Sequence, residues 1–437
     1  MQRICLVSDF FYPNVGGVEE HIYNLAQCLI SRGHKVIVIT HSYDNRKGIR
    51  YMTNGLKVYY LPIKVFYNQC ILPTMIANIP LIRYIYIRER IEIVHGHSAF
   101  SALAHEAMLI GNLMKLKTVF TDHSLFGFAD MSAVLTNKFL EISLVACTHC
   151  ICVSHIGKEN TVLRAKVSFD RVSVIPNAVD TYSFTPQVQM RPKDSIVIVV
   201  VSRLVYRKGV DLMAQVMADI CVRYPNVSFL IGGDGPKLWL LQEIREQFGL
   251  HDRVTLLGAL KHSEVTDVLN QGHIFLNTSL TEAFCMAIVE AASCGLHVVS
   301  TQVGGIPEVL PSDMIFLTEP TAEALIKGVE AAIAKMEAGD IPCPYVNNDR
   351  VRSYYNWLNV TQRTEVVYNH ILRTELKSPG EQLASYLSTG AWPFLLVVTL
   401  CKVILMILEY IFPSKNIDIA PDYDMEVILK RREKKIN

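Results

Sequence analysis

Short apolar runs rich in isoleucine, valine and leucine alternate with longer segments in which apolar residues recur every three or four positions. The short runs predict buried strands and the longer segments amphipathic helices. Such an alternation is typical of a parallel sheet covered by helices on both faces. In the amino-terminal part of the chain we expect strands at 4–8, 35–40, 57–62, 91–95 and 118–122, with helices at 18–32 and 98–114.

A second series of the same kind follows, which predicts two Rossmann-like, doubly wound α/β domains in tandem. Its strands are expected at 195–202, 228–232, 254–257, 274–277, 297–300 and 315–317. Residues 180–194, which contain Pro186, Pro192 and several polar residues, form the natural connection, and we place the domains at 1–182 and 183–372. Ligands of open parallel sheets bind beyond the carboxyl ends of strands, so we expect the site in the cleft between the domains.

Residues 391–412 form an apolar stretch long enough to span a membrane, with Trp392 and Tyr410 near its ends. After a linker at 373–390 we therefore predict one transmembrane helix, followed by a short tail at 413–437. Lys402 near the middle is costly in lipid unless it faces a partner helix or reaches the interface.

Two features of the sequence favour opposite orientations of this helix in the membrane. Met1 leads directly into an apolar strand pattern and not into a cleavable signal peptide, which favours cytosolic domains and a lumenal tail. The five cations of the tail favour a cytosolic tail instead; they are Lys430, Arg431, Arg432, Lys434 and Lys435. Because these cations begin some distance after the helix, we expect the lumenal tail.

Charge and cysteine content exclude several classes of function. The chain has 42 Lys and Arg against 41 Asp and Glu, and no basic stripe with interleaved aromatics, so we expect no nucleic-acid partner. The 11 cysteines form no regular framework, which indicates a reducing compartment. Cys147 and Cys150 form a C-x-x-C pair, but a second ligand pair is missing, so a buried apolar segment is favoured over a zinc site.

Glu282 and Glu290 stand eight residues apart. Residues 283–294 have the composition of a helix that Gly295 would end, so Glu282 directly precedes this predicted helix and Glu290 lies within it. In a helix this spacing separates them by about 12 Å, whereas the carboxylate pairs of glycoside hydrolysis lie about 5 to 9.5 Å apart. The two carboxylates are therefore suited to bind separate hydroxyl groups of one long ligand, such as a nucleotide sugar. For Glu290 taken alone, a solvated helix charge is the favoured interpretation, because the apolar residues around it are the one hint that it points inward.

Arg203 and Lys208 follow the first strand of the second domain, where two cations can hold a diphosphate and stabilise it as it leaves. A solvated basic turn is the alternative. Gly16 and Gly17 follow the first strand of the chain and open a helix, so their backbone can receive a phosphate, although G-x-G-x-x-G is absent.

The sequence predicts no metal and no cofactor. A D-x-D pattern that could hold a metal at the diphosphate is missing from the strand ends, and the one at residues 422–424 lies in the tail. His95, His97 and His123 stand at strand ends of the first domain. We place His123 at the sugar and interpret His95 and His97 as structural.

Together these residues resemble the retaining glycosyltransferases of the GT-B fold that carry the E-x7-E signature. The segments that match are 10–19, 203–209, 232–236, 282–290 and 304–308, within about residues 3–370. A closer resemblance, in 8–13, 45–51 and 121–130 and in the carboxyl-terminal span, is to the enzymes that start glycosylphosphatidylinositol (GPI) anchor synthesis. It implies transfer of N-acetylglucosamine from UDP-GlcNAc to phosphatidylinositol at the cytosolic face of the endoplasmic reticulum, in a complex with small membrane subunits.

The same resemblance implies the roles of individual residues. Arg203 and Lys208 would bind the donor diphosphate, Glu290 the ribose, and Glu282 and His123 the transferred sugar, while Gly16 and Gly17 would approach the phosphates. Acceptor attack on the same face of the sugar, with the leaving phosphate taking the proton, would retain configuration without a protein nucleophile. Glu282 as a covalent nucleophile is the less favoured alternative.

The acceptor side rests on weaker signals. Glu19 is a candidate for the acceptor, and Arg46 and Lys47, with Arg50, form the nearest cationic cluster for the lipid phosphate or, equally well, a solvated loop. Residues 63–90 could rest on a membrane, although core packing is favoured. Three other functions stay open: the same chemistry on another lipid or glycan, an inactive membrane scaffold, and an epimerase that uses nucleotide sugars.

Overall fold

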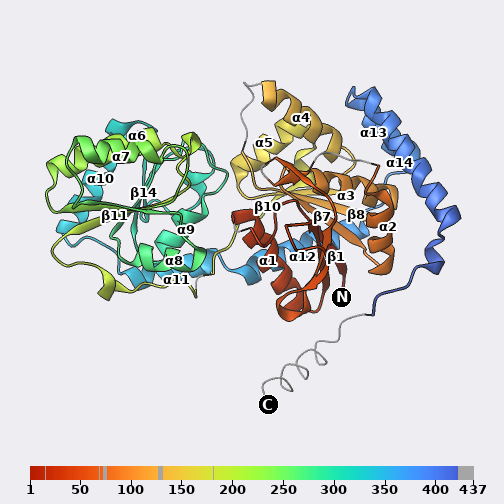
Figure 1. Ribbon diagram of the computed structural model, residues 1–437, viewed down its shortest axis with the longest axis horizontal. Coiled ribbons are helices and arrows are strands. Elements are labelled where there is room, and N and C mark those ends of the chain that lie inside the picture. The colour runs from red at the N-terminus through yellow and green to blue at the C-terminus, as the bar shows by residue number, and fades with distance from the viewer. Residues whose placement is uncertain (15, 68, 72–75, 126–130, 181, 422–437) are drawn as a thin grey trace, which may run out of the picture. The chain divides into compact units, whose positions relative to one another are not determined.

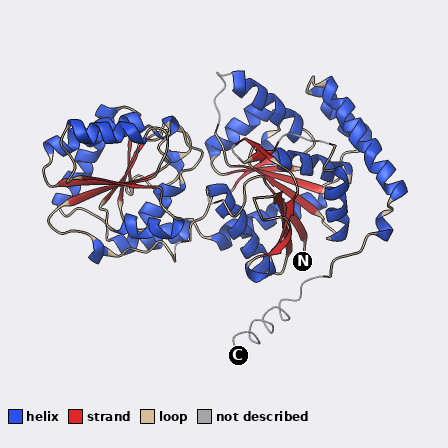
Figure 2. Ribbon diagram, in the orientation of Figure 1, coloured by secondary structure: helices blue, strands red, loops and turns tan. Residues whose placement is uncertain are grey.

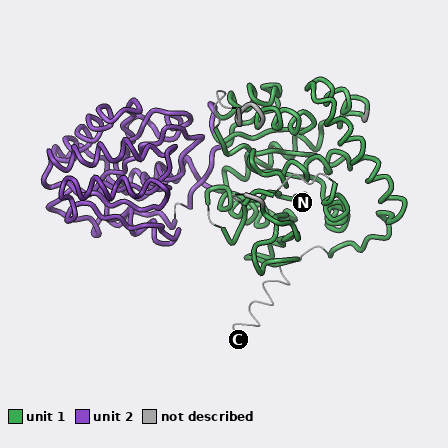
Figure 3. The backbone as a smooth tube through the Cα atoms, turned by 45° about the horizontal axis from the view of Figure 1, so that its top comes forward, with its two compact units in different colours: residues 1–153, 157–175, 357–437 green, residues 154–156, 176–356 purple. Residues whose placement is uncertain are grey.

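The computed structural model describes the chain apart from residues 15, 68, 72–75, 126–130, 181 and 422–437. The chain folds into two compact units (Figure 3). Unit 1 contains residues 1–153, 157–175 and 357–437, and unit 2 contains residues 154–156 and 176–356. Each unit has its own sheet with helices on both faces (Figure 2), so the predicted pair of doubly wound α/β domains is confirmed.

Unit 1 is built on an eight-stranded sheet in the order β10-β9-β8-β7-β1-β2-β4-β3 (Figure 1). Its pairs are parallel except for β3 with β4 at the edge. Because both faces are covered, the central strands β1, β2, β7 and β8 are buried without alternation. The strands are β1 (Arg3–Val7), β2 (Lys35–His41), β3 (Gly48–Tyr51), β4 (Lys57–Leu61), β7 (Ile93–His97), β8 (Lys117–Asp122), β9 (His149–Cys152) and β10 (Val172–Val174).

The helices of unit 1 cover this sheet, and α3 is buried along its whole length. Ser101 caps α3, because its Oγ accepts a hydrogen bond of 3.1 Å from the backbone N–H of Ala104. The helices are α1 (Gly17–Ser31), α2 (Ile79–Arg88), α3 (Ala102–Leu113), α4 (Met131–Leu144), α5 (His155–Ala165), α12 (Trp357–Arg373), α13 (Pro379–Ser388) and α14 (Trp392–Ile411). A small hairpin, β5 (Val65–Tyr67) and β6 (Cys70–Ile71), precedes α2.

Unit 2 has a six-stranded parallel sheet in the order β13-β12-β11-β14-β15-β16. Its strands are β11 (Ile196–Val201), β12 (Val227–Gly232), β13 (Val254–Gly258), β14 (Ile274–Asn277), β15 (His297–Thr301) and β16 (Ile315–Thr318). Its helices are α6 (Val210–Arg223), α7 (Leu238–Gln247), α8 (His262–Asn270), α9 (Met286–Ser293), α10 (Ala322–Glu337) and α11 (Pro344–Tyr354). The predicted strands of the second series are all present.

The predicted boundary of the second domain at residue 372 is wrong, because α12 belongs to unit 1. Helix α12 packs on α1, and its buried residues include Val367, Tyr368 and Ile371, of which Tyr368 reaches His95 of β7. Arg32 of α1 donates to Glu365 of α12 at 2.7 Å, which adds an ion pair between the two helices. The helical pattern of 357–373 predicts an amphipathic helix but does not say which sheet its apolar face covers.

The carboxyl-terminal apolar stretch forms α14, which is the one helix in the described part of the chain that is long and apolar enough to cross a membrane. Val398, Cys401 and Leu405 face unit 1 and are buried, whereas Leu396 is 65% and Met406 63% exposed. The helix thus has one side on unit 1 and an open apolar side.

Lys402 points toward unit 1. Its Nζ donates to the backbone oxygen of Leu113 at the end of α3, at 3.0 Å. A lysine in the middle of an apolar helix therefore has a polar partner inside its own chain, which reduces the cost that the sequence suggested.

Two further expectations concern buried segments. Cys147, Cys150 and Cys152 are buried and free, as the interpretation of a buried apolar segment required. In α2, Ile79 and Ile82 are buried in the core of unit 1, which supports core packing over an interfacial role for this segment.

Candidate active site

The loop after β11 and the loop after β14 bring two of the predicted donor residues together. Lys208 lies at the end of a short 3-10 turn, and its Nζ forms an ion pair with Oε1 of Glu282. Burial disfavours the charge of Lys208, but the carboxylate of Glu282 outweighs it and raises the pKa of Lys208. Both side chains are therefore charged and partly accessible at the carboxyl edge of the sheet.

Gly209 sets the distance between these two loops. Its φ of +64° is the left-handed conformation, and a Cβ at this position would lie 1.9 Å from the backbone oxygen of Thr278. Thr278 in turn donates from Oγ1 to the backbone oxygen of Lys208 at 2.8 Å. A side chain at residue 209 would force the two loops apart, so the ion pair depends on this glycine.

Glu282 lies in an extended loop and not at the start of a helix. The expected helix at 283–294 begins only at Met286, because Cys285 takes a left-handed φ of +71° that interrupts the helical path. The estimate of about 12 Å between the two glutamates assumed one continuous helix and does not apply. Ser279, which the sequence did not single out, donates from Oγ to Oε1 of Glu282 at 2.9 Å.

The other two donor candidates of unit 2 lie close to this pair but outside it. Arg203 is exposed in the loop after β11, and its charge acts on Lys208. Glu290 lies on α9 and is partly exposed. Unit 2 thus presents two cations and two carboxylates from neighbouring loops and one helix, which suits a ligand with phosphates and hydroxyl groups.

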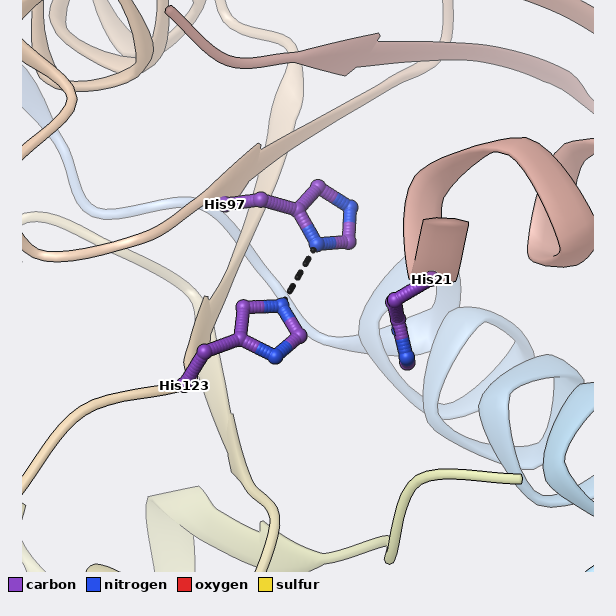
Figure 4. Close-up of side chains that lie close together, drawn as sticks. All are labelled: His21, His97 and His123. Carbon is purple, nitrogen blue, oxygen red and sulfur yellow. Dashed lines mark hydrogen bonds between the residues drawn. The ribbon is translucent and has the colours of Figure 1, made fainter. Parts of the chain in front are cut away.

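Unit 1 brings three histidines together at the carboxyl edge of its sheet (Figure 4). His97 ends β7, His123 follows β8, and His21 comes from α1. Nδ1 of His97 and Nε2 of His123 lie 3.3 Å apart and share a hydrogen bond. The ring of His21 stands at a steep angle to that of His123, with 4.7 Å between centroids. The sequence did not point to His21, because nothing in its local pattern separates it from an ordinary helix residue.

Only His123 of this cluster can reach a ligand. His21 and His97 are buried, whereas His123 is partly exposed. Burial, together with the neighbouring histidines, holds the pKa values of His97 and His123 well below the ordinary value, so both rings are neutral near pH 7. A neutral imidazole can donate or accept one hydrogen bond at each nitrogen, which suits a sugar hydroxyl.

His95 lies next to this cluster but has a structural environment. Its Nδ1 contacts the hydroxyl of Tyr368 at 2.7 Å, and its Nε2 contacts Oγ1 of Thr121 at 2.6 Å. Both nitrogens of the buried ring therefore have partners within unit 1, in agreement with its interpretation as structural.

The three-histidine cluster is also the group among the described residues whose spacing could hold a metal ion. One ligand atom from each of His21, His97 and His123 lies within 4.8 Å of the others. Neutral imidazoles are competent ligands for a transition metal. The contact between Nδ1 of His97 and Nε2 of His123 gives these two nitrogens a partner without an ion.

Asp122 positions His123, and the sequence assigned it no role. Its Oδ1 accepts from the backbone N–H of Ser124 at 3.0 Å, and its Oδ2 accepts from Oγ1 of Thr161 at 3.1 Å. The guanidinium of Arg164 lies 3.5 Å away, and both charged groups are buried. Burial raises the pKa of Asp122, and the charge of Arg164 opposes this shift. The loop that carries His123 is thus held on both sides of the histidine.

Gly16 and Gly17 stand at the start of α1, as expected, and no side chain caps this end of the helix. The carboxylate of Glu19 folds back over Gly16, because a Cβ on Gly16 would lie 2.6 Å from Oε2 of Glu19. A negative group in the first turn stabilises the helix, but at this place it would repel a phosphate. A phosphate can approach this backbone only if Glu19 turns away.

The candidate acceptor cations lie on the surface of unit 1. Arg46 and Lys47 are exposed in the turn that joins β2 to the edge strand β3, and Arg50 is exposed on β3 itself. This turn begins at the carboxyl end of β2, the same edge of the sheet that carries Gly16 and His123. Of the matched segment 121–130, residues 126–130 lie outside the described part of the chain, as do residues 422–424.

Two sequence models of known families match the chain. The family described as PIGA (GPI anchor biosynthesis) matches residues 41–130, and the family described as glycosyl transferases group 1 matches residues 183–339. The first match covers the turn with Arg46 and the strand end with His123. The second covers the loops that carry Lys208 and Glu282.

Curated relatives match nearly the whole chain. The human A subunit of phosphatidylinositol N-acetylglucosaminyltransferase is 57% identical over 96% of this chain and 87% of the relative. The protein of the same name from Arabidopsis thaliana is 51% identical over 96% of this chain and 94% of the relative. The gpi3 subunit of this transferase from Schizosaccharomyces pombe is 47% identical over 95% of this chain and 92% of the relative.

Solved structures with low sequence identity share the fold. Sucrose-phosphate synthase from Thermosynechococcus elongatus aligns with a TM-score of 0.68 at 18% identity, over 85% of this chain and 99% of that chain. The Anabaena protein HepE in complex with UDP-glucose aligns with a TM-score of 0.63 at 17% identity, over 84% of this chain and 99% of that chain. The expected GT-B fold is thereby confirmed.

The histidine environment predicts a loss of stability at acid pH. The pKa of His95 is lowered to about 3 and that of His97 well below its ordinary value, whereas an unfolded chain takes up these protons near pH 6.5. Because the unfolded state binds more protons in this window, stability falls as the pH drops below about 6.5, by about 2 kcal/mol per buried histidine at pH 5. Thermal unfolding of the purified protein between pH 7 and pH 5 measures this loss.

A neutral replacement tests the assignment to His97. His97→Asn should lose less stability than the parent protein between pH 7 and pH 5. The matched control is His251→Asn, since His251 is exposed and pairs only with Glu246 on the surface. Equal pH slopes for the parent and for His97→Asn would contradict the prediction.

The contacts of Asp122 predict a large effect of its removal. Asp122→Ala should destabilise the protein by about 3 to 5 kcal/mol, because the buried charge of Arg164 loses its ionic partner. Asp122→Asn keeps an acceptor for Ser124 and should cost less. The control is Asp170→Ala, which removes an exposed aspartate of the same unit. Thermal midpoints compare the three variants, and a midpoint of Asp122→Ala equal to that of the control would refute the role.

Proposed function

Because the chain belongs to the family of the A subunits of phosphatidylinositol N-acetylglucosaminyltransferase, we propose that it transfers N-acetylglucosamine from UDP-GlcNAc to phosphatidylinositol. This reaction is the first step of GPI-anchor synthesis. The observation that carries the proposal is the identity of 47 to 57% over at least 95% of the chain with three relatives that bear this activity in their names. The chain is accordingly a glycosyltransferase with an N-acetylglucosaminyltransferase activity.

The donor would bind by exchanging one ion pair for two new contacts. Without a donor, Lys208 and Glu282 neutralise each other. When the donor enters, Lys208 turns with Arg203 to the diphosphate, and Glu282 accepts a hydrogen bond from a hydroxyl of the sugar. Glu290 binds the ribose. The two cations then stabilise the charge that develops on the leaving UDP.

His123 would contribute a neutral hydrogen-bonding group to the transferred sugar. Its partial exposure and its lowered pKa favour this role over that of a charged group. The acceptor hydroxyl attacks the face of the sugar from which UDP leaves, and a phosphate oxygen of UDP takes the proton. This path retains the configuration and needs no nucleophile from the protein.

The acceptor side of the proposal uses residues at the same edge of the unit 1 sheet. Glu19 would accept from hydroxyl groups of the inositol ring, and its movement toward the acceptor would free the backbone of Gly16 and Gly17 for the donor phosphates. Arg46 and Lys47 would hold the phosphate of phosphatidylinositol. The exposure of both cations supports this assignment.

No metal and no cofactor enter the proposed reaction. Arg203 and Lys208 supply the positive charge that a divalent cation gives to other nucleotide-sugar enzymes. The three-histidine cluster lies in unit 1, whereas both cations lie in unit 2. Two other functions compete with the proposal: transfer to another lipid or glycan, and an inactive scaffold. The pairing of Lys208 with Glu282 at strand ends disfavours the scaffold.

The partners follow from the relatives, which are named as subunits of a transferase. The chain is therefore one component of a multi-subunit enzyme, and we propose small membrane proteins as the other subunits. Its family and the apolar helix α14 associate it with a membrane. We propose the endoplasmic reticulum membrane, with both units in the cytosol and the tail after α14 in the lumen.

A transfer assay on microsomes tests the activity and the donor residues together. With the partner subunits present, labelled UDP-GlcNAc and phosphatidylinositol should give N-acetylglucosaminyl-phosphatidylinositol. Lys208→Met should lower the rate by about 10² to 10³, because one of the two groups that stabilise the leaving diphosphate is lost. Thin-layer separation of the labelled lipid gives the rate.

Two controls accompany this assay. Lys327→Met removes an exposed lysine on α10 that is also ion-paired, with Glu323 at 2.7 Å, and should leave the rate unchanged. The chelator EDTA should leave it unchanged as well, since the proposal uses no metal. Absence of the product with all subunits present would defeat the acceptor and donor assignment and leave the fold untouched.

Glycosylation tests the proposed topology. The three sequons at Asn226, Asn277 and Asn359 should carry no glycan in cells, and a sequon added after residue 437 should be glycosylated. Gel mobility with and without an endoglycosidase measures both.

One observation favours a different orientation of the tail. Arg83 pairs with Glu409 and Arg88 with Asp418 at 2.5 Å, so α14 contacts unit 1 at its carboxyl end too. If the added sequon stays unmodified, α14 lies along unit 1 with both ends on the cytosolic side. A glycan on any of the three native sequons would reverse the topology altogether.

A further inference from the structure

Unit 1 contains a cavity of about 320 Å³ where α14 meets the end of α3 and the start of α13. Lys115 and Leu113 come from the end of α3 and the turn after it, Lys377 from the segment before α13, and Lys402 from the middle of α14. Three segments that are distant in sequence therefore each place one lysine in the wall of the same cavity.

Two of the three lysines of this cavity donate to neutral partners. Nζ of Lys402 donates to the backbone oxygen of Leu113 at 3.0 Å, and Nζ of Lys377 donates to Oγ of Ser385 at 2.8 Å and to the backbone oxygen of Val145 at 3.3 Å. No aspartate or glutamate is among the described residues that line the cavity. The wall thus gathers three positive charges without a carboxylate to neutralise them, which favours an anionic occupant.

The electrostatic environment of Lys377 also favours an anion. Burial and the positive charge of Arg171 lower the pKa of Lys377, while the nearby carboxylate of Glu381 only partly opposes them. An anion in the cavity would relieve this excess of positive charge.

The rest of the wall is apolar and continues onto the surface of α14. Val398, Val403 and Leu383 line the cavity. Val403 is 43% exposed, and Leu400 on the neighbouring part of α14 is 46% exposed. This surface belongs to the helix that is long and apolar enough to cross a membrane. A cationic cavity that opens onto such a surface fits a molecule with a charged head and hydrocarbon chains.

The cavity lies at the opposite edge of the sheet from the histidine cluster. Lys115 stands two residues before β8, whereas His123 immediately follows it. The six residues of β8 separate the two ends by about 20 Å. A lipid in the cavity is therefore distinct from an acceptor that reacts near His123.

We propose that this cavity binds the headgroup phosphate of an anionic phospholipid, whose acyl chains lie along the open apolar face of α14. The phosphate is held by Lys115, Lys377 and Lys402, and the bound lipid fastens α14 to α3 and α13. The lipid is not a substrate. Its binding does not depend on the transferase reaction, so a failure of the activity assay leaves this proposal standing.

Lipid binding to the intact complex tests the proposal. The purified complex in detergent receives dioleoyl phosphatidylserine, which has no inositol, or dioleoyl phosphatidylcholine, which has no net charge, and native mass spectrometry counts the retained lipid. One phosphatidylserine per complex should be retained in preference to phosphatidylcholine. Lys115→Gln with Lys377→Gln should weaken this retention about tenfold or more, since two charge-assisted contacts are lost.

The matched control is Lys64→Gln with Lys193→Gln, which removes two exposed lysines outside the cavity and should leave retention unchanged. Because Lys115 and Lys377 are themselves exposed, their double variant should keep the thermal midpoint that the complex has in detergent without added lipid, and each single variant gives a second measurement. Equal retention of the two lipids, unchanged retention in the double and single variants, or displacement of phosphatidylserine by millimolar inorganic phosphate would each overturn the proposal.

Discussion

The parallel order of both sheets is the constraint on which the candidate site depends. In a parallel sheet every strand ends at the same edge, and each connection must cross back over a face before the next strand begins. The loops at the carboxyl edge are therefore neighbours, however distant they are in sequence. In unit 1 these loops carry Gly16, Gly17, Arg46, Lys47 and His123, and in unit 2 they carry Arg203, Lys208 and Glu282.

In the ion pair between Lys208 and Glu282, the two charges that we propose for the donor site neutralise each other. Both groups have already lost part of their hydration, so the exchange of partners on donor binding costs less than the burial of two free charges would. The close approach of Gly209 to Thr278 keeps the two loops at the distance at which this exchange works. In the proposed reaction, the pair thus links the packing of β11 against β14 to the binding of a diphosphate and a sugar.

In unit 1, the side chains at the carboxyl edge of the sheet include histidines without charge. His97 and His123 touch, and burial keeps both without charge. A charged His123 could only donate hydrogen bonds, whereas the neutral ring can also accept one from a sugar hydroxyl. Asp122, which is paired with Arg164, holds the loop that carries this ring through the backbone N–H of Ser124. At the other edge of the same sheet, Lys402 turns the apolar helix α14 toward unit 1, and the three lysines around it form a surface for a membrane lipid.

The periodicity of apolar positions determined much of the fold, because strands buried on both faces and amphipathic helices leave strong local patterns. The predicted strands, the two sheets and α14 all appear in the structure. The candidate residues could be named because Lys208, Glu282 and His123 stand next to apolar strand patterns in the sequence itself. The extent of the helix after Glu282 could not, since the left-handed Cys285 that delays it has no local signal.

Long-range packing decided the remainder. Helix α12 returns to unit 1 because its apolar face fits α1, and no local pattern states which of two sheets a helix will cover. Asp122 and His21 acquire roles only through neighbours that are distant in sequence, and Ser279 acquires one through the fold of the loop that it shares with Glu282. The sequence by itself determined the elements and the chemical groups at the strand ends, because these depend on local periodicity and residue type. Only the tertiary structure decided which of those groups touch, because contact depends on strand order and on the packing of helices across each sheet.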